Sequence, residues 1–165
     1  MKLLSEYRAL HARKVFPGMS CLQWAPDIAA LVGEFDSQTL LDYGCGLGWQ
    51  YTRERVHRVW DRKIPALYDP AVKGLDQPPY GTFDGVICTD VLEHVPEDEL
   101  PALVHRLSEL AGQWIFLSIC CRPSKRITFT DGMNVHVTLH PLEWWQHYLD
   151  GKFKKTTRVV IRETK

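Results

Sequence analysis

Apolar and polar positions along the 165-residue chain repeat with two periods, one typical of helices and one typical of strands. Helical spacing predicts helices over 1–14, 22–35, 49–60, about 98–112 and 141–149. Short apolar runs predict strands at 40–42, 64–70, from 83 onward, 114–121 and 153–162, and 136–139 is expected to be extended. The run 114–121 is almost continuously apolar, with Ser118 as its one polar residue, which is typical of a central parallel strand. Strands and helices that alternate in this way predict an α/β fold.

The segment Leu40–Gly48 has the most informative local pattern, reading L-L-D-Y-G-C-G-L-G. An apolar strand ends in Asp42, three glycines follow at every second position, and a helical segment begins at Trp49. Glycines allow a sharp turn and a close approach of another group to the backbone. This strand–turn–helix arrangement is typical of the first unit of a doubly wound sheet that binds a nucleotide.

Two later segments carry acids at or just after the ends of predicted strands. Leu67-Tyr68-Asp69-Pro70 closes the second strand. The segment Phe83–Val95 reads F-D-G-V-I-C-T-D-V-L-E-H-V. Together with D-x-G-x-G-x-G at Asp42–Gly48, these segments resemble the ordered motifs of the class I S-adenosylmethionine (SAM) methyltransferases. The resemblance covers about residues 22–145.

The resemblance implies a compact single domain over 1–165, with a doubly wound, mostly parallel Rossmann-like sheet and helices on both faces. Residues 1–36 would form helices that cover the site, and 37–165 would form the core. It implies SAM as the cofactor and an acid after strand two that binds the ribose hydroxyls. The implied cofactor contacts are Asp42, Gly44, Cys45, Gly46, Gly48, Asp69, Asp90, Val91 and Leu92. Tyr7, His11 and Trp24 are expected at the mouth of the site.

One segment departs from the family pattern. Residues 70–82 are proline-rich and too short for the helix and third strand that the family usually has there. Asp76 is the acid available for the adenine in this segment, and the departure leaves that contact open.

Composition is that of an ordinary globular domain, with 45% hydrophobic and 24% charged residues. No apolar run approaches the ~18 residues of a membrane span, so no membrane partner is expected. Five cysteines without a Cys-x-x-Cys pair predict free thiols in a reducing, cytoplasmic setting. The net charge is zero, but 64–112 is acidic and 113–165 is basic. An acidic middle suits the sulfonium cation of SAM, while the basic end leaves nucleic acid open as a less favoured partner.

Catalytic and substrate residues are predicted from the segments that follow the strand beginning at 83 and the strand 114–121. His136 is the candidate general base and His94 the second catalytic candidate, because imidazole titrates near neutral pH. Asn134, Trp144 and Trp145 are candidates for binding a polar, ring-bearing acceptor. His136 and His140 have a metal-like spacing, but no acid completes a set, so no metal is expected.

Methyl transfer from SAM to a small molecule or saccharide is therefore the favoured function. Alternatives are methylation of nucleic acid or protein, a non-catalytic SAM-binding partner subunit, and an NAD-dependent oxidoreductase. The chain lacks the N/D-P-P-Y/F tetrapeptide of base-amino methyltransferases, with Thr89-Asp90-Val91-Leu92 in its place. The acceptor atom and the oligomeric state do not follow from the sequence.

Overall fold

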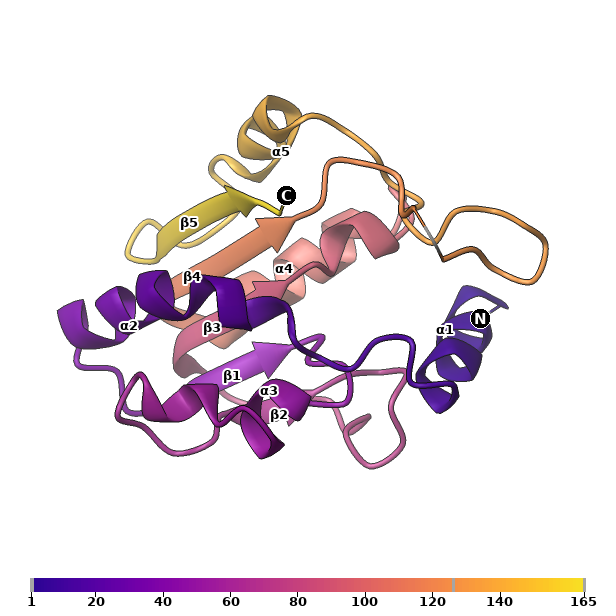
Figure 1. The fold of residues 1–165 in the computed structure, drawn as a ribbon. Helices are drawn as coiled ribbons and strands as arrows, with labels where there is room; N and C mark the ends of the chain where they lie inside the picture. Colours follow the sequence, from indigo (N-terminus) through magenta and orange to yellow (C-terminus); the bar gives the residue numbers. More distant parts are fainter. Residues whose placement is uncertain (1, 126, 165) are drawn as a thin grey trace.

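The fold was analysed in a computed structural model that describes residues 2–125 and 127–164. Within these residues five parallel strands form one sheet in the order β2-β1-β3-β4-β5 (Figure 1). The strands are β1 (Leu40–Tyr43), β2 (Ala66–Tyr68), β3 (Phe83–Thr89), β4 (Ala111–Ile119) and β5 (Arg158–Glu163). The doubly wound α/β fold predicted from the sequence is confirmed.

Helices cover both faces of the sheet (Figure 1). The helices are α1 (Lys2–Ala12), α2 (Ala25–Glu34), α3 (Trp49–Thr52), α4 (Leu100–Leu110) and α5 (Leu142–Leu149), with 3₁₀ turns η1 (Ser20–Trp24), η2 (Val56–Arg58) and η3 (Leu92–His94). On one face α4 and α5 bury a cluster with Val86 and Leu117. On the other, η1 and α2 pack against Ile87 and Phe116. Alternate residues of β3 and β4 thus supply two separate cores, as strands buried on both faces do. Among the described residues, none of the helices has the length and apolar character that crossing a membrane requires.

The single helix expected over 49–60 is wrong. The helix ends at Thr52, and Arg55 adopts a left-handed backbone conformation with φ of 55° before η2 begins. A non-glycine residue in that region cannot continue an α-helix. Arg53, Arg55 and Arg58, which one helix over 49–60 would place on a common basic face, therefore do not share one helical face.

The other element boundaries shift more modestly. Helix α4 begins at Leu100 rather than near Asp98, and it ends at Leu110 because β4 starts directly at Ala111. Gly112 therefore lies inside β4 and is not a helix end. The segment 136–139 forms no strand. Between β2 and β3 the described chain has no further strand, as the short segment 70–82 predicted.

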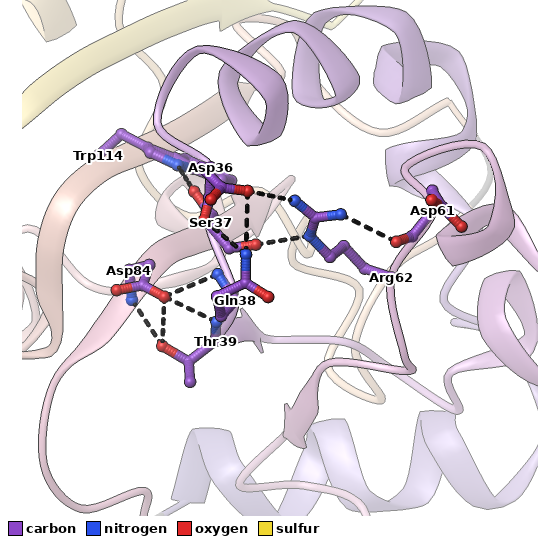
Figure 2. A network of polar contacts seen from close by, with 8 residues as sticks. All are labelled: Asp36, Ser37, Gln38, Thr39, Asp61, Arg62, Asp84 and Trp114. Atoms are coloured by element: carbon purple, nitrogen blue, oxygen red, sulfur yellow. Dashed lines mark hydrogen bonds and ion pairs between the residues drawn. The ribbon is translucent and has the colours of Figure 1, made fainter.

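A polar network joins the turns at the amino ends of the strands (Figure 2). Asp84 Oδ2 accepts hydrogen bonds from the amides of Gln38 and Thr39, each at 2.8 Å. Burial acts to raise the pKa of Asp84, but these bonds outweigh it and lower the pKa. The Trp114 indole donates to Ser37 Oγ at 2.8 Å. These hydrogen bonds tie together the turns at the amino ends of the strands. The carboxyl ends of the strands lie at the opposite edge of the sheet.

Candidate active site

A cavity of about 540 Å³ lies at the carboxyl ends of β1, β2 and β3. The chain leaves β1 for β2 on one side and continues with β3 on the other, so this is the point where the strand order reverses. Ligands bind at such points in open α/β sheets. Of the predicted cofactor residues, Gly44, Gly46, Asp69, Asp90 and Val91 line the cavity.

The amides of the glycine turn are all used within the protein. Those of Gly44 and Cys45 donate to the Tyr68 carbonyl, at 2.7 and 3.1 Å. The amides of Trp49 and Gln50, in the first turn of α3, donate to the carbonyls of Pro17 and Gly18, at 3.1 and 2.9 Å. A pyrophosphate needs such amides at a helix N-terminus, and here the chain's own backbone occupies them. This disfavours a dinucleotide.

The glycines serve close packing of the protein. Gly46 has a φ of 57°, and a Cβ there would lie 2.9 Å from the Gly18 nitrogen. A Cβ on Gly44 would lie 2.3 Å from the Val91 side chain. The segment 16–18 thus fits directly against the turn, and the sequence interpretation that the glycines make room for a ligand misses this contact.

Two carboxylates face the cavity from neighbouring strand ends. Asp69 follows β2 and is 6% exposed, and it accepts hydrogen bonds from the amides of Gly46 and Ala71, both at 2.9 Å. A carboxylate offers about four acceptor positions, so capacity remains for a ligand. Asp90 follows β3 with a φ of 55°, and its Oδ1 accepts from the hydroxyls of Ser118 and Thr164.

Four other predicted cofactor residues do not line the cavity. They are Asp42, Cys45, Gly48 and Leu92. Leu92 is fully buried in the apolar core under α4, and Cys45 is 1% exposed. Asp42 is fully buried, where burial raises its pKa to about 7 against the opposing hydrogen bonds from Tyr51 and Gln50. Asp42, Cys45 and Gly48 thus belong to the interior of the first strand and its turn, and Leu92 belongs to the core after β3.

Glu93, His94 and His136 come together on the cavity wall. Burial raises the pKa of Glu93 well above its usual value, with Asp90 adding to the effect. Burial, together with His136, lowers the pKa of His94 to about 3. The imidazole of His94 is therefore neutral at physiological pH. The rings of His94 and His136 meet edge to face with centroids 4.8 Å apart.

Helix α1 and the segment 127–137 cover the cavity from outside, and Figure 1 shows both beyond the carboxyl ends of the strands. Tyr7 Oη lies 2.8 Å from the Val135 carbonyl and 3.0 Å from that of His94. His11 Nε2 lies 3.7 Å from Asp69 Oδ1. Tyr7 and His11 line the cavity, whereas Trp24 packs against Phe116 on the sheet.

The structure does not bring the predicted substrate residues to the cavity. Trp145 is fully buried in the core. Trp144 stacks on His140 and on Tyr148, with centroid distances of 3.8 and 4.9 Å, so its ring already has aromatic partners within the protein. Asn134 Oδ1 accepts from the amides of Ser124 and His136, which positions the His136 backbone instead.

The sequence interpretation missed several cavity residues. The segment Phe16–Ser20 and the side chains of Cys120 and Thr164 line the site without having been predicted. The P-G pair at Pro17-Gly18 marks a turn, but only the fold places that turn against the glycines of β1. Thr164 carries no local signal, since it reaches Asp90 only through the pairing of β5 with β4.

Comparison with known proteins agrees with this geometry. A family model described as a methyltransferase domain matches residues 13–157, which is most of the chain. No curated protein and no solved structure matched significantly. With a parallel sheet in the order 2-1-3-4-5 and a cavity at its switch point, this chain belongs to the methyltransferase domain family and is a SAM-dependent methyltransferase.

Proposed function

We propose that this chain binds SAM in the cavity at the ends of β1, β2 and β3 and methylates a hydroxyl or amine of a small molecule or saccharide. The observation that carries the proposal is the convergence of the glycine turn, Asp69 and Asp90 on one cavity. SAM, when bound, supplies an electrophilic methyl group on a sulfonium centre. Residues of the chain must bind the cofactor, hold the acceptor and take up its proton.

The two carboxylates fit the polar parts of this cofactor. Asp69 is buried and retains acceptor capacity, which suits the vicinal hydroxyls of a ribose. Asp69 and Asp90 together put negative charge beside the cavity, which favours a cation there. Apolar groups from Phe16, Ala71 and Val91 complete the wall and suit the adenine ring.

The cover over the cavity favours a small acceptor. The Thr130 hydroxyl donates to Glu6 Oε2 at 2.7 Å, and Tyr7 bonds to the same covering segment. A nucleic acid or a folded protein would have to displace both contacts to reach the cavity. A small hydroxylated molecule can enter a cavity of about 540 Å³ beside the cofactor's reactive end.

His136 is the group best placed to handle the acceptor's proton. Its ring lines the cavity and is partly exposed, so it can meet a molecule that enters from outside. A hydroxyl is a weak nucleophile until its proton is removed, and imidazole is suited to that transfer. The partly buried His94 contacts the ring of His136 edge to face.

The proposal is tested by calorimetric titration with SAM, S-adenosylhomocysteine and NADH. We expect SAM and S-adenosylhomocysteine to bind, and NADH not to bind. Asp69→Asn should weaken SAM binding by about 10–100-fold, since hydrogen bonds to a charged group contribute about 1.5–3 kcal/mol. Asp61→Asn is the matched control, because Asp61 is exposed and does not line the cavity.

Incubation with methyl-labelled SAM identifies the acceptor class. Pools of hydroxylated metabolites and saccharides should take up label, whereas RNA, DNA and protein should not. NADH binding without SAM binding would overturn the cofactor assignment. Label in nucleic acid or protein alone would overturn the acceptor assignment, and SAM binding without transfer to any pool would favour a non-catalytic subunit.

A further inference from the structure

Three metal-ligating side chains converge from two different segments of the chain. Glu93 and His94 lie in the turn after β3, and His136 lies in the segment after β4. One potential ligand atom from each lies within 4.8 Å of those from the other two. All three residues line the cavity. Because β3 and β4 are adjacent parallel strands, the segments that follow them emerge at the same edge of the sheet.

The hydrogen bonds of the two imidazoles determine which nitrogen is free. His94 Nδ1 lies 3.0 Å from the Val135 carbonyl, and His136 Nδ1 lies 2.6 Å from the Arg122 carbonyl. The Tyr7 hydroxyl also lies 3.1 Å from His94 Nδ1, but it has the carbonyls of Val135 and His94 as acceptors for its own proton. A carbonyl oxygen only accepts, so both Nδ1 atoms carry the proton. Each Nε2 therefore bears the lone pair. Metal-binding histidines characteristically donate their other N–H to a carbonyl in this way.

The carboxylate of Glu93 is only half satisfied. Its Oε1 accepts from the Cys120 amide at 2.8 Å, which fixes the side chain. Glu93 is fully buried, and its Oε2 has no hydrogen-bond partner among the described residues. Buried polar atoms in native proteins nearly always have a partner. The orphaned oxygen therefore points to a ligand that the protein alone does not supply.

We propose that Glu93, His94 and His136 bind a divalent transition-metal ion at the cavity wall. Two imidazole nitrogens and one carboxylate oxygen form a donor set that suits ions such as Zn²⁺, Fe²⁺ and Co²⁺, whereas Mg²⁺ and Ca²⁺ favour oxygen donors. Three protein ligands leave coordination positions open. Because all three residues line the cavity, we place these open positions on the cavity side.

The site would change the role of His136. One lone pair cannot bind a metal ion and also take a proton, so His136 would act as a ligand and not as a general base. If the proposed methyl transfer also holds, an acceptor oxygen can occupy the open position, where a metal lowers the pKa of a bound hydroxyl. Metal binding itself does not depend on that function.

The test is direct titration of metal-depleted protein. The whole chain is treated with EDTA, the chelator is removed, and Zn²⁺ and Co²⁺ are titrated by calorimetry, with bound metal counted by elemental analysis. We expect one ion per chain. Glu93→Gln and His136→Asn should each weaken binding by at least the roughly 10–100-fold that loss of an outer-shell partner causes. Glu93→Gln keeps the oxygen that accepts from Cys120.

His140→Asn is the matched control. His140 is a partly exposed histidine that pairs with Glu97 and stacks on Trp144, and it neither lines the cavity nor belongs to the cluster. The His140→Asn variant should bind the metal ion with the affinity of the wild type. Circular dichroism and melting temperature establish that each variant is folded. No binding to the wild type, or wild-type affinity in both folded ligand variants, would overturn the proposal. SAM titration of the same samples is unaffected by that result, so the two proposals fail separately.

Discussion

The hydroxyl of Tyr51 donates a hydrogen bond to Asp42 Oδ2 at 2.7 Å, deep inside the protein. Gln50 Nε2 donates to the same oxygen at 2.6 Å, while Asp42 Oδ1 has no partner among the described residues. Asp42 lies near the carboxyl end of β1, and both donors lie in α3. The acid of the glycine motif thus holds the short α3 helix against the sheet from within the core.

This buried carboxyl predicts a stability that falls as pH rises. The pKa of Asp42 is raised to about 7 by burial, whereas an unfolded Asp titrates near about 3.9. Between those values the folded state holds a proton that the unfolded state has lost, so raising the pH favours unfolding. Asp42→Asn removes this titration. Relative to wild type, its free energy of unfolding should increase by about 2–3 kcal/mol from pH 5 to pH 8.

Urea denaturation of both proteins at the two pH values measures the difference. Other groups titrate equally in both proteins and cancel in the comparison. If the free energies of unfolding of wild type and Asp42→Asn differ by the same amount at pH 5 and at pH 8, Asp42 is already ionised in the folded protein at pH 5.

Gly85 is predicted to be required for the packing of Trp114. A Cβ at Gly85 would lie 2.1 Å from the Trp114 ring, which is fully buried. Gly85→Ala should therefore destabilise the protein by about 1–3 kcal/mol through overpacking. Gly33 in α2 has nothing within 4 Å of its Cβ position, so Gly33→Ala should be neutral or stabilising. Melting temperatures that change equally in the two variants would contradict this account.

The sequence predicted the fold well because each strand of the sheet carries its own signal. The run 114–121 is apolar except for Ser118, and β4 overlaps it from Trp114 to Ile119. The prediction of one helix over 49–60 was wrong although Val56 and Trp60 are buried as the helical spacing implied. The left-handed backbone of Arg55 interrupts the helix between the first apolar residues and these two. Periodicity reports which residues are buried and does not report backbone conformation.

The site was less predictable, since its residues are joined by tertiary contacts. Asp69 and Asp90 were found because strand ends converge in a parallel sheet. Glu93 and His136 are 43 positions apart, and only the adjacency of β3 and β4 brings them together. Trp144 and Trp145 come soon after His136 in the sequence, which suggested a place near the cavity. They lie in α5 instead, where they pack onto the sheet and onto each other.

Tyr7 is predicted to hold the cover over the cavity closed. Its hydroxyl lies within hydrogen-bond distance of the Val135 and His94 carbonyls. Tyr7→Phe should remove about 0.5–1.5 kcal/mol of local stability and speed amide hydrogen exchange in α1 and in 127–137. Exchange in β3 and β4 should not change. Tyr80→Phe, at a position that is 86% exposed, is the control, and faster exchange in both variants would show that the Tyr7 hydroxyl is not the cause.

His136→Asn separates a chemical role from a structural one. His136 is partly exposed, so the substitution should leave the melting temperature nearly unchanged. Single-turnover methyl transfer should fall by about 10²–10⁴-fold if proton removal is lost, with SAM affinity unaltered. His94→Asn is the comparison, because His94 is packed against Tyr7 and Phe16 and bonded to Val135. His94→Asn should lower the melting temperature. If His94 has only a structural role, the activity of this variant should follow the folded fraction, and if His94 binds the metal ion, the activity should fall further than the folded fraction.

Chelation then decides what His136 contributes. If its lone pair binds a metal ion, EDTA should abolish wild-type turnover, and added Zn²⁺ or Co²⁺ should restore it. The same ions should not restore His136→Asn. If the lone pair takes the acceptor's proton directly, EDTA should leave wild-type turnover unchanged while His136→Asn remains slow. A His136→Asn enzyme with full turnover would exclude both roles, because neither a ligand nor a base can be removed without loss of rate. In that case the contact between His136 Nδ1 and the Arg122 carbonyl would serve to shape the segment after β4.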